Sequence, residues 1–248
     1  MGSPRLSVII PAYNEASRIT RTLESVTRYL RYQDFVAEVL VADDGSTDET
    51  PDLVTAFTSP ESPVKLISMP HQGKGGAVKS GMLQARGDYR FLCDADLAMP
   101  IDQISRFFDL IQHADIVIGS RQVKGARRFH EPPVRQLMGR ILNVLIRTAG
   151  GVRNIEDTQC GFKMFRREAA EALFRQQTLK AFGFDIEILY LAQRQQLRVT
   201  ELGVDWYHQP DSKVRSIHDS LVVLAEMIKI RSNHLRGRYE FGSTIRTD

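Results

Sequence analysis

The sequence predicts a single α/β domain built on a mostly parallel, doubly wound central sheet with helices on both faces. Short runs rich in β-branched and other apolar residues alternate with amphipathic segments, which is the pattern of strand–helix–strand units. Each run is nearly all apolar, as expected for strands that are covered on both faces. The predicted strands span residues 6–10, 36–41, 64–69, 89–93 and 115–118. In such a sheet, active residues collect at the carboxyl ends of the strands.

The alternation loosens after Arg121. A segment rich in Gly, Arg and Pro comes first, and the pattern then predicts helices over 134–148, 184–195 and 217–231 and a strand over 198–207. We find no internal repeat and no low-complexity linker. We therefore expect one domain over residues 1–248, with a front half at 5–121, a back half at 122–232 and a basic tail at 233–248.

Composition excludes several classes of protein. With 248 residues, 42% apolar and 25% charged, the chain is neither collagen, nor a simple coiled coil, nor disordered. Cys93 and Cys160 are far apart and have no CxxC partner, which argues against a disulfide scaffold or a zinc site and favours a reducing, cytoplasmic compartment. No stretch approaches the ~18 consecutive apolar residues of a membrane span.

The formal net charge is only +3, too balanced to predict a nucleic-acid partner. The charges are nevertheless unevenly distributed. Residues 33–52 hold seven acidic side chains and no Lys or Arg, whereas residues 119–153 hold eight basic side chains opposed by Glu131 alone. The near-neutral net charge thus combines an acidic and a basic segment, which have opposite local electrostatic fields.

Polar motifs follow the first two predicted strands. The first runs into a turn that opens a helix, and the second ends in carboxylates that precede a flexible turn and a helix start. A carboxylate there can accept a hydrogen bond from a base or a ribose hydroxyl; simple helix capping is the alternative. The motifs are Pro11-Ala12-Tyr13-Asn14-Glu15 and Asp43-Asp44-Gly45-Ser46-Thr47-Asp48.

The fourth predicted strand ends in Asp94-Ala95-Asp96. Residues i and i+2 of an extended chain face the same side, so both carboxylates can reach one site. Two hard oxygen ligands suit a divalent ion whose other positions are filled by diphosphate oxygens and water. A pair of solvated loop carboxylates is the alternative, and a lone DxD favours it.

Gly73-Lys74-Gly75-Gly76 precedes a predicted helix. The segment is not a Walker motif, because GxxxxGK[ST] is absent. Its glycines instead permit a close approach of the backbone to a ligand or of the helix to the sheet. Lys74 faces either solvent or a nucleotide.

In this order, and each at a strand end, these four motifs resemble those of the family 2 glycosyltransferases of GT-A fold. The resemblance implies a nucleoside-diphosphate-sugar donor, inversion at the anomeric carbon and a Mg²⁺ or Mn²⁺ ion. It implies that the front half of the chain binds the donor and the back half shapes the acceptor site. It places Asp94 near the ribose or diphosphate and Asp96 on the metal, with Asp94 as a second candidate ligand. The other residues that it places at the donor are Pro11, Ala12, Tyr13, Glu15, Asp43, Asp44, Lys74 and Ala95.

Within that family, two further segments resemble the subgroup that glycosylates polyprenyl phosphates such as dolichyl phosphate. They are Gly119-Ser120-Arg121 and residues 156–165, and the resemblance covers residues 5–231. Asp157 falls where inverting relatives carry the acid that faces the acceptor. For an alcohol acceptor it would be the general base, whereas for a phosphate, already anionic near pH 7, it would orient the acceptor. A structural loop acid is the alternative.

An anionic acceptor that approaches an anionic donor needs cations. The resemblance implies that Arg121, Ser212 and Lys213 contact the acceptor phosphate. It also implies that Arg121 and Lys213 act in catalysis together with Asp157. Further acceptor candidates are Arg127, Arg128, Arg135 and Gln159. For the arginines, a solvated basic face is the alternative.

The motif departs from the mannosyl-transferring members at one point. Those often continue the DxD with Leu-Gln, whereas Leu97-Ala98 follows here. The missing glutamine shifts the expected donor from GDP-mannose towards UDP-glucose and removes one potential metal or phosphate ligand.

Two helices carry apolar stripes flanked by basic residues. Val134, Leu137, Met138, Ile141, Leu142 and Leu145 form one, and Ile217, Leu221, Leu224 and Ile228 form the other. A basic amphipathic helix can rest on an anionic bilayer, but it can equally pack on the sheet or form a homodimer face. Peripheral membrane contact therefore stays open.

Three other functions compete with transfer to a lipid phosphate. The first is transfer to a hydroxyl group of a polysaccharide or small molecule, and the second is binding of sugar nucleotides without turnover. The third is nucleotidyl transfer to a sugar 1-phosphate, against which we note the lack of a Gly-rich basic segment near the N-terminus.

Overall fold

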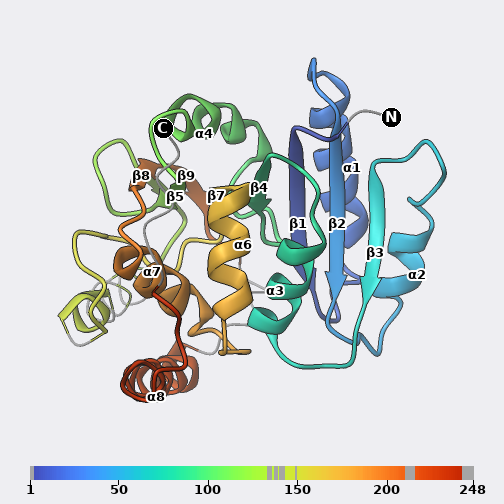
Figure 1. Ribbon diagram of the computed structural model, residues 1–248. Helices are drawn as coiled ribbons and strands as arrows, with labels where there is room; N and C mark the ends of the chain where they lie inside the picture. Colours follow the sequence, from blue (N-terminus) through green and yellow to red (C-terminus); the bar gives the residue numbers. More distant parts are fainter. Residues whose placement is uncertain are drawn as a thin grey trace.

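The computed structural model has a seven-stranded sheet with the strand order β3-β2-β1-β4-β7-β5-β8 (Figure 1). It describes residues 3–132, 136, 139, 143–148, 150–209 and 216–241, with the backbone alone at 216–221 and 224. Among the described strands of this sheet, β7 alone runs antiparallel to its neighbours. The strands are β1 (Leu6–Ala12), β2 (Ala37–Asp43), β3 (Val64–Ser68), β4 (Tyr89–Leu92), β5 (Ile116–Ser120), β7 (Lys163–Arg166) and β8 (Val199–Gly203).

Helices cover both faces of this sheet, which confirms the predicted α/β class. In Figure 1, α3 and α6 lie in front of the sheet and α1 lies behind it. One core layer joins the sheet to α1 (Ile19–Arg31), α2 (Thr50–Thr55) and α4 (Ile104–Ile111), the last preceded by the 3₁₀ turn η1 (Ile101–Gln103). The other joins it to α3 (Lys74–Gln84), α6 (Arg167–Gln176), α7 (Phe184–Arg194) and α8 (Ser216–Leu235).

Alternation along the strands divides the core between these layers. Val8 and Ile10 of β1 pack towards α1, while Ile9 between them packs towards α3. Both sets are fully buried, because a parallel strand covered on both faces has no solvent side. The nearly all-apolar runs in the sequence are the direct result.

Strand β7 and the helix α6 that follows it were not predicted. β7 is only four residues long and pairs with β4 and β5 in the middle of the sheet. It begins at Lys163, a charged residue that is 1% exposed and that hides the strand from a hydrophobicity pattern. Because β7 and β8 come from beyond residue 122, both halves of the chain build one sheet.

The single strand predicted over 198–207 was wrong in one respect. The chain forms β8 up to Gly203 and then β9 (Asp205–Tyr207), which pairs with β6 (Arg127–Phe129) in a separate two-stranded sheet. A Cβ at Gly203 would lie 2.6 Å from the backbone nitrogen of Ala126. The glycine thus lets the 124–126 backbone pass close by at the point where the strand changes sheet.

The other predicted elements are confirmed, with shifted ends. The predicted helix at 184–195 is α7, and the last helix is longer than predicted, from 216 to 235. Helix is present at 143–148, while most of the apolar stripe predicted before it lies outside the described residues. Among the described helices, none combines the length and apolar character needed to cross a membrane.

The packing of Phe107 on α4 gives a test of this fold. Phe107 is fully buried and lies edge-on to Phe91, with ring centroids 5.3 Å apart. We expect Phe107→Ala to lower the free energy of unfolding by about 3–5 kcal/mol, measured by urea denaturation. Phe108→Ala, which removes the same group from a partly exposed neighbour, should cost clearly less. Equal losses would contradict the assigned orientation of α4.

Candidate functional site

A cavity of about 380 Å³ opens at the carboxyl ends of β1, β2 and β4. It brings together most of the predicted donor residues, from four separate motifs. The lining residues are Pro11, Ala12, Tyr13, Glu15, Arg18, Asp44, His71, Gly73, Lys74, Ala77, Asp94, Ala95, Asp96, Ala181 and Phe182. Among the predicted donor residues, Asp43 alone is not in this lining.

The first two motifs are bound directly to each other. The Asn14 side-chain oxygen accepts a hydrogen bond from the Thr47 amide at 2.7 Å, and the Asn14 amide donates to Ser46 Oγ at 2.8 Å. The Glu15 amide likewise donates to Thr50 Oγ1 at 2.8 Å. Asn14 has a φ of 53°, a left-handed conformation that Asn tolerates better than most residues. The two loops therefore form one wall.

Asp43 and Asp44 are both 2% exposed, yet they have different contacts. The Asp43 carboxylate accepts hydrogen bonds from the amide and hydroxyl groups of Ser46, which closes the turn after β2. The Asp44 carboxylate accepts hydrogen bonds from the Gln72 and Gly73 amides, each at 2.8 Å. Asp43 thus makes the turn contacts expected of a structural residue, whereas Asp44 holds the 71–73 loop against the cavity.

His71 was missed from the sequence, where a lone loop histidine gives no signal. Its Nδ1 lies 2.8 Å from Asp44 Oδ2, and its ring stacks on Tyr13 with centroids 4.3 Å apart. Both rings line the cavity. The two rings thus form an aromatic stack that a nucleobase can extend.

Lys74 and Asp94 form an ion pair at the centre of the cavity. Lys74 Nζ lies 2.6 Å from Asp94 Oδ1. Burial opposes both charges, but each charge favours the other, so the pKa of Asp94 is lowered and the pKa of Lys74 is raised. Lys74 therefore faces the cavity, and both groups are ionised at neutral pH.

Asp96 has the opposite shift. Burial, followed by the charge of Asp94, raises the pKa of the Asp96 carboxyl. Asp96 Oδ1 accepts a hydrogen bond from the Ala98 amide at 3.0 Å. A site in which one carboxylate resists ionisation because of another is one where a bound cation is stabilising.

These two carboxylates fit a divalent ion as an incomplete ligand set. Among the residues that the structure describes, no group of three or more His, Cys, Asp or Glu side chains is placed to hold a metal. Asp94 and Asp96 supply hard oxygen donors, which Mg²⁺ and Mn²⁺ prefer. The remaining positions would have to come from a ligand or water.

Gly161 allows the Asp94 side chain its position. A Cβ at Gly161 would lie 1.8 Å from Asp94 Oδ2, so any side chain there would displace the carboxylate. Next to it, Lys163 Nζ donates to the Cys160 carbonyl oxygen at 2.8 Å and pairs with Asp185, which is 6% exposed. Asp185 was not predicted from the sequence, because an acidic residue in the first turn of a helix is common and gives no separate signal.

Arg121 and Asp157 form an ion pair on the side of the predicted acceptor site. Asp157 is fully buried, and its carboxylate accepts hydrogen bonds from the Arg121 amide, Nε and Nη2 at 2.7–2.9 Å. Burial opposes the carboxylate charge, but Arg121 lowers the pKa of Asp157 below its ordinary value. The Arg121 guanidinium also lies 5.6 Å from the centre of the Trp206 ring. Here Asp157 is bound as a salt-bridge partner, and its role in the reaction remains a prediction.

The other predicted acceptor cations are also paired where the structure describes them. Arg127 pairs with Asp205, and Arg128 pairs with Glu131 at 2.8 Å while donating to the Arg121 carbonyl oxygen. Gln159 is partly exposed on the loop between them and β7. Arg135, Ser212 and Lys213 lie outside the described residues. The roles of these residues stay predictions.

Both cysteines are buried free thiols. Burial, followed by the nearby charge of Asp157, raises the pKa of the Cys160 thiol to about 12. A thiol held neutral in this way is a poor nucleophile.

The buried Arg121–Asp157 pair predicts a pH-dependent contribution to stability. Because the folded-state pKa of Asp157 lies below the unfolded value, the pair stabilises the fold fully above about pH 4, and this is lost as the pH falls through the folded value. We expect Asp157→Asn to lower the free energy of unfolding by about 3 kcal/mol at neutral pH and by less in acid, measured by urea denaturation.

Asp205→Asn is the matched control for this variant. It also removes a carboxylate from an arginine, but Arg127 is 68% exposed, so the cost should be below about 1 kcal/mol. A loss for Asp157→Asn no larger than that of the control would show that the buried pair adds nothing.

Comparison with solved structures supports the fold. The glucosyl-3-phosphoglycerate synthase of Mycobacterium tuberculosis in complex with UDP matches with a TM-score of 0.68 and 21% identity, over 92% of this chain and 80% of that one. The same enzyme with Mn²⁺, UDP-glucose and glycerol 3-phosphate matches with a TM-score of 0.67 and 19% identity, over the same shares. At this identity the likeness concerns the fold alone, which is GT-A.

Comparison of sequences gives the family. Dolichyl-phosphate β-glucosyltransferases are similar to this chain: 38% identity in Trichomonas vaginalis, over 84% of this chain and 65% of that protein, and 31% in Saccharomyces cerevisiae, over 94% and 76%. The match thus spans about two thirds to three quarters of these relatives. The family described as Glycosyl transferase family 2 matches residues 7–174. The chain therefore belongs to glycosyltransferase family 2.

Proposed function

We propose that this protein transfers glucose from UDP-glucose to a polyprenyl phosphate such as dolichyl phosphate, with inversion at the anomeric carbon and with a divalent metal. The observation that carries the proposal is the similarity to dolichyl-phosphate β-glucosyltransferases at 29–38% identity. It extends over 84–97% of the chain, and so includes the back half, where acceptors bind.

The cavity at the carboxyl ends of β1, β2 and β4 would hold the donor. Tyr13 and His71 offer a stacking wall for the base, and the polar edge at Asp44 lies beside them. Asp94 and Asp96 would hold a Mg²⁺ or Mn²⁺ ion, which when bound supplies positive charge against the diphosphate. Lys74, which pairs with Asp94, would add a cation beside the diphosphate at the same place.

On the acceptor side, the chemistry needs orientation more than deprotonation. A phosphate monoester has a second pKa of about 6, so its oxygen is already anionic near neutral pH. That oxygen would form the bond to the anomeric carbon while the bond from this carbon to the UDP oxygen breaks, and UDP leaves with the electron pair. An Asp157 that is bound by Arg121 fits an orienting role, because neither of its oxygens needs to accept a proton.

Arg121 would then contribute through its fixed position. Its guanidinium is held by Asp157 and by the face of Trp206, and its side chain remains 24% exposed. We propose that this exposed part contacts the acceptor phosphate, together with Ser212 and Lys213. Glucose is the proposed sugar because Ala98 stands where mannosyl-transferring members often carry glutamine.

An assay of UDP release tests the proposal. We expect turnover with UDP-glucose that needs both Mg²⁺ or Mn²⁺ and a polyprenyl phosphate, and little with GDP-mannose. Turnover that does not depend on the lipid would favour a hydroxyl acceptor or hydrolysis. Binding of UDP-glucose without UDP release in the presence of any acceptor would indicate a non-catalytic binding protein.

Asp96→Asn tests the metal site. Removal of this charge should lower metal-dependent turnover about a hundredfold or more, because the cation loses a ligand. Asp102→Asn removes an exposed acid six residues further along the chain and should leave turnover unchanged. An unaffected Asp96→Asn enzyme would refute its assigned role.

Gly161→Ala tests the position of Asp94. The added methyl group must displace the Asp94 carboxylate, so we expect turnover to fall about a hundredfold, as for a misplaced catalytic group. Gly139→Ala adds the same methyl group where no atom of the described residues lies within 4 Å and should be harmless. Turnover of Gly161→Ala equal to that of the control would show that the contact between the Cys160–Gly161 loop and Asp94 does not matter.

A further inference from the structure

Lys163 is a buried cation whose charge acts on both sides of the site. It begins β7, is 1% exposed and does not line the donor cavity. Burial raises the pKa of Asp94, whereas Lys74 and, after it, Lys163 lower it. Burial likewise raises the pKa of Asp157, whereas Arg121 and, after it, Lys163 lower it. One ammonium group therefore stabilises a donor carboxylate and the acid on the acceptor side.

The Lys163 ammonium also closes the turn that leads into β7. Its Nζ donates to the Cys160 carbonyl oxygen at 2.8 Å. Gly161 lies within this turn and approaches Asp94 so closely that a Cβ there would be 1.8 Å from Oδ2. Any shift of the turn therefore changes the space that is left for the Asp94 carboxylate.

The same turn is bound to the end of β5, which leads to the acceptor side. The Phe162 carbonyl oxygen accepts a hydrogen bond from the Gly119 amide at 2.8 Å. A Cβ at Gly119 would lie 2.9 Å from Cys160 Sγ, so the strand and the turn are in close contact. Arg121 follows two residues later. The 160–163 turn thus joins the donor carboxylate to the strand end that carries the acceptor cation.

Asp185 anchors the ammonium from α7. It lies in the first turn of that helix and pairs with Lys163. Burial raises the pKa of Asp185 even though Lys163 and Lys74 lower it, so pairing does not fully offset the burial of this carboxylate. A neutral pair of similar size would fill the same space without that cost. The ion pair therefore adds little to stability, which indicates that it serves to place the 160–163 turn.

We propose that Lys163, held by Asp185, is a positioning residue for the divalent metal site. By closing the 160–163 turn against Asp94, it fixes a carboxylate that would bind the ion. The inference rests on the metal site of the proposed function. Loss of a residue that orients a metal ligand commonly weakens metal binding about 10–100-fold. Because Lys163 acts through the turn, its loss should not affect the part of the cavity that would bind the base.

Two neutral replacements test this role without leaving a buried charge unpaired. Lys163→Met with Asp185→Asn removes one cation and one anion, so the net charge around the site does not change. A change in metal affinity then reports on the position of Asp94 and not on charge. Lys163→Gln with Asp185→Asn is the conservative version, because the Gln amide can still donate to the Cys160 carbonyl oxygen. It also serves if the first variant does not fold.

Titration calorimetry of Mn²⁺ into the full-length protein with UDP gives the readout, without a sugar or a lipid. We expect the Kd for Mn²⁺ to rise about tenfold or more with Met and Asn, and to rise less with Gln and Asn. The affinity for UDP in EDTA should not change. In urea, the Met and Asn variant should unfold close to the midpoint of the unchanged protein, whereas Lys163→Met alone leaves Asp185 unpaired and should unfold earlier.

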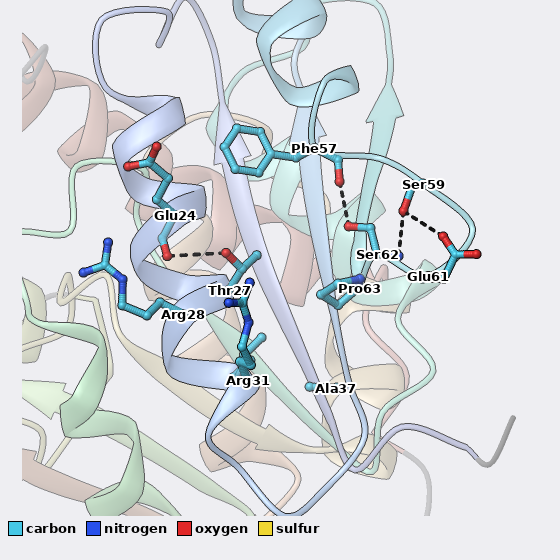
Figure 2. Close-up of a pocket in the computed structure, with 11 residues that line it drawn as sticks. Glu24, Thr27, Arg28, Arg31, Ala37, Phe57, Ser59, Glu61, Ser62 and Pro63 are labelled. Atoms are coloured by element: carbon cyan, nitrogen blue, oxygen red, sulfur yellow. Dashed lines mark hydrogen bonds between the residues drawn. The ribbon is translucent and has the colours of Figure 1, made fainter.

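The groove in Figure 2 provides a matched control. It has a volume of about 800 Å³, lies between α1 and the loop before β3, and shares no lining residue with the donor cavity. Glu24 and Arg28 are exposed on its α1 wall (Figure 2). Glu24→Gln with Arg28→Met likewise removes one anion and one cation, and this variant should bind Mn²⁺ like the unchanged protein.

Two results would overturn the inference. One is an unchanged Kd for Mn²⁺ in the double variants that circular dichroism shows to be folded. The other is a loss of UDP affinity in EDTA as large as the loss of Mn²⁺ affinity, because the pair would then support the cavity as a whole. Lipid-dependent UDP release, assayed in parallel, reports on the proposed function separately. Mn²⁺ binding that depends on Lys163 in a protein that releases no UDP would contradict that function and still support this role of Lys163.

Discussion

The structure depends on the pairing of charges that are buried at the carboxyl edge of its sheet. An unpaired ion in such a place costs several kcal/mol, so each charge needs a partner within hydrogen-bonding distance. Lys74 and Asp94 come from α3 and the end of β4, Lys163 and Asp185 from β7 and α7, and Arg121 and Asp157 from the end of β5 and the loop before β7. Each pair joins segments that are distant in sequence. The fold is thus required to bring these segments together, and the pairs in turn hold the loops around the donor cavity.

This pairing also changes the meaning of the net charge. The sequence shows an acidic region at 33–52 and a basic region at 119–153, which suggests two separate fields. In the structure, Glu131 and Asp205 neutralise Arg128 and Arg127, and Asp157 binds Arg121. These three arginines of the basic region are therefore compensated by acids from inside and outside its own stretch.

The sequence predicted correctly those features of the fold and the site that depend on the local pattern of apolar and polar residues. The apolar runs located β1 to β5, and the polar residues after β1, β2 and β4 do meet in one cavity, because parallel strands share a carboxyl edge. It failed for residues whose positions depend on contacts with segments that are distant in the sequence. Strand β7 contains a buried lysine whose partner, Asp185, is 22 residues away. Hydrophobic periodicity does not indicate such a pair. The stacking of His71 on Tyr13 and the contact of Gly161 with Asp94 are likewise products of packing.

Helix α8 joins the wall of the donor cavity to the outer surface of the molecule. On its inner side, Glu226 accepts a hydrogen bond from the Gly183 amide at 2.7 Å, directly after Ala181 and Phe182 of the donor cavity. Asn233 donates to Thr178, whose amide donates to the buried carboxylate of Glu187. The same helix carries Ile228 and Leu235 on its outer side. The hydrogen bonds of α8 therefore hold the 178–183 segment, which forms one wall of the donor cavity, against a helix whose other side faces outward.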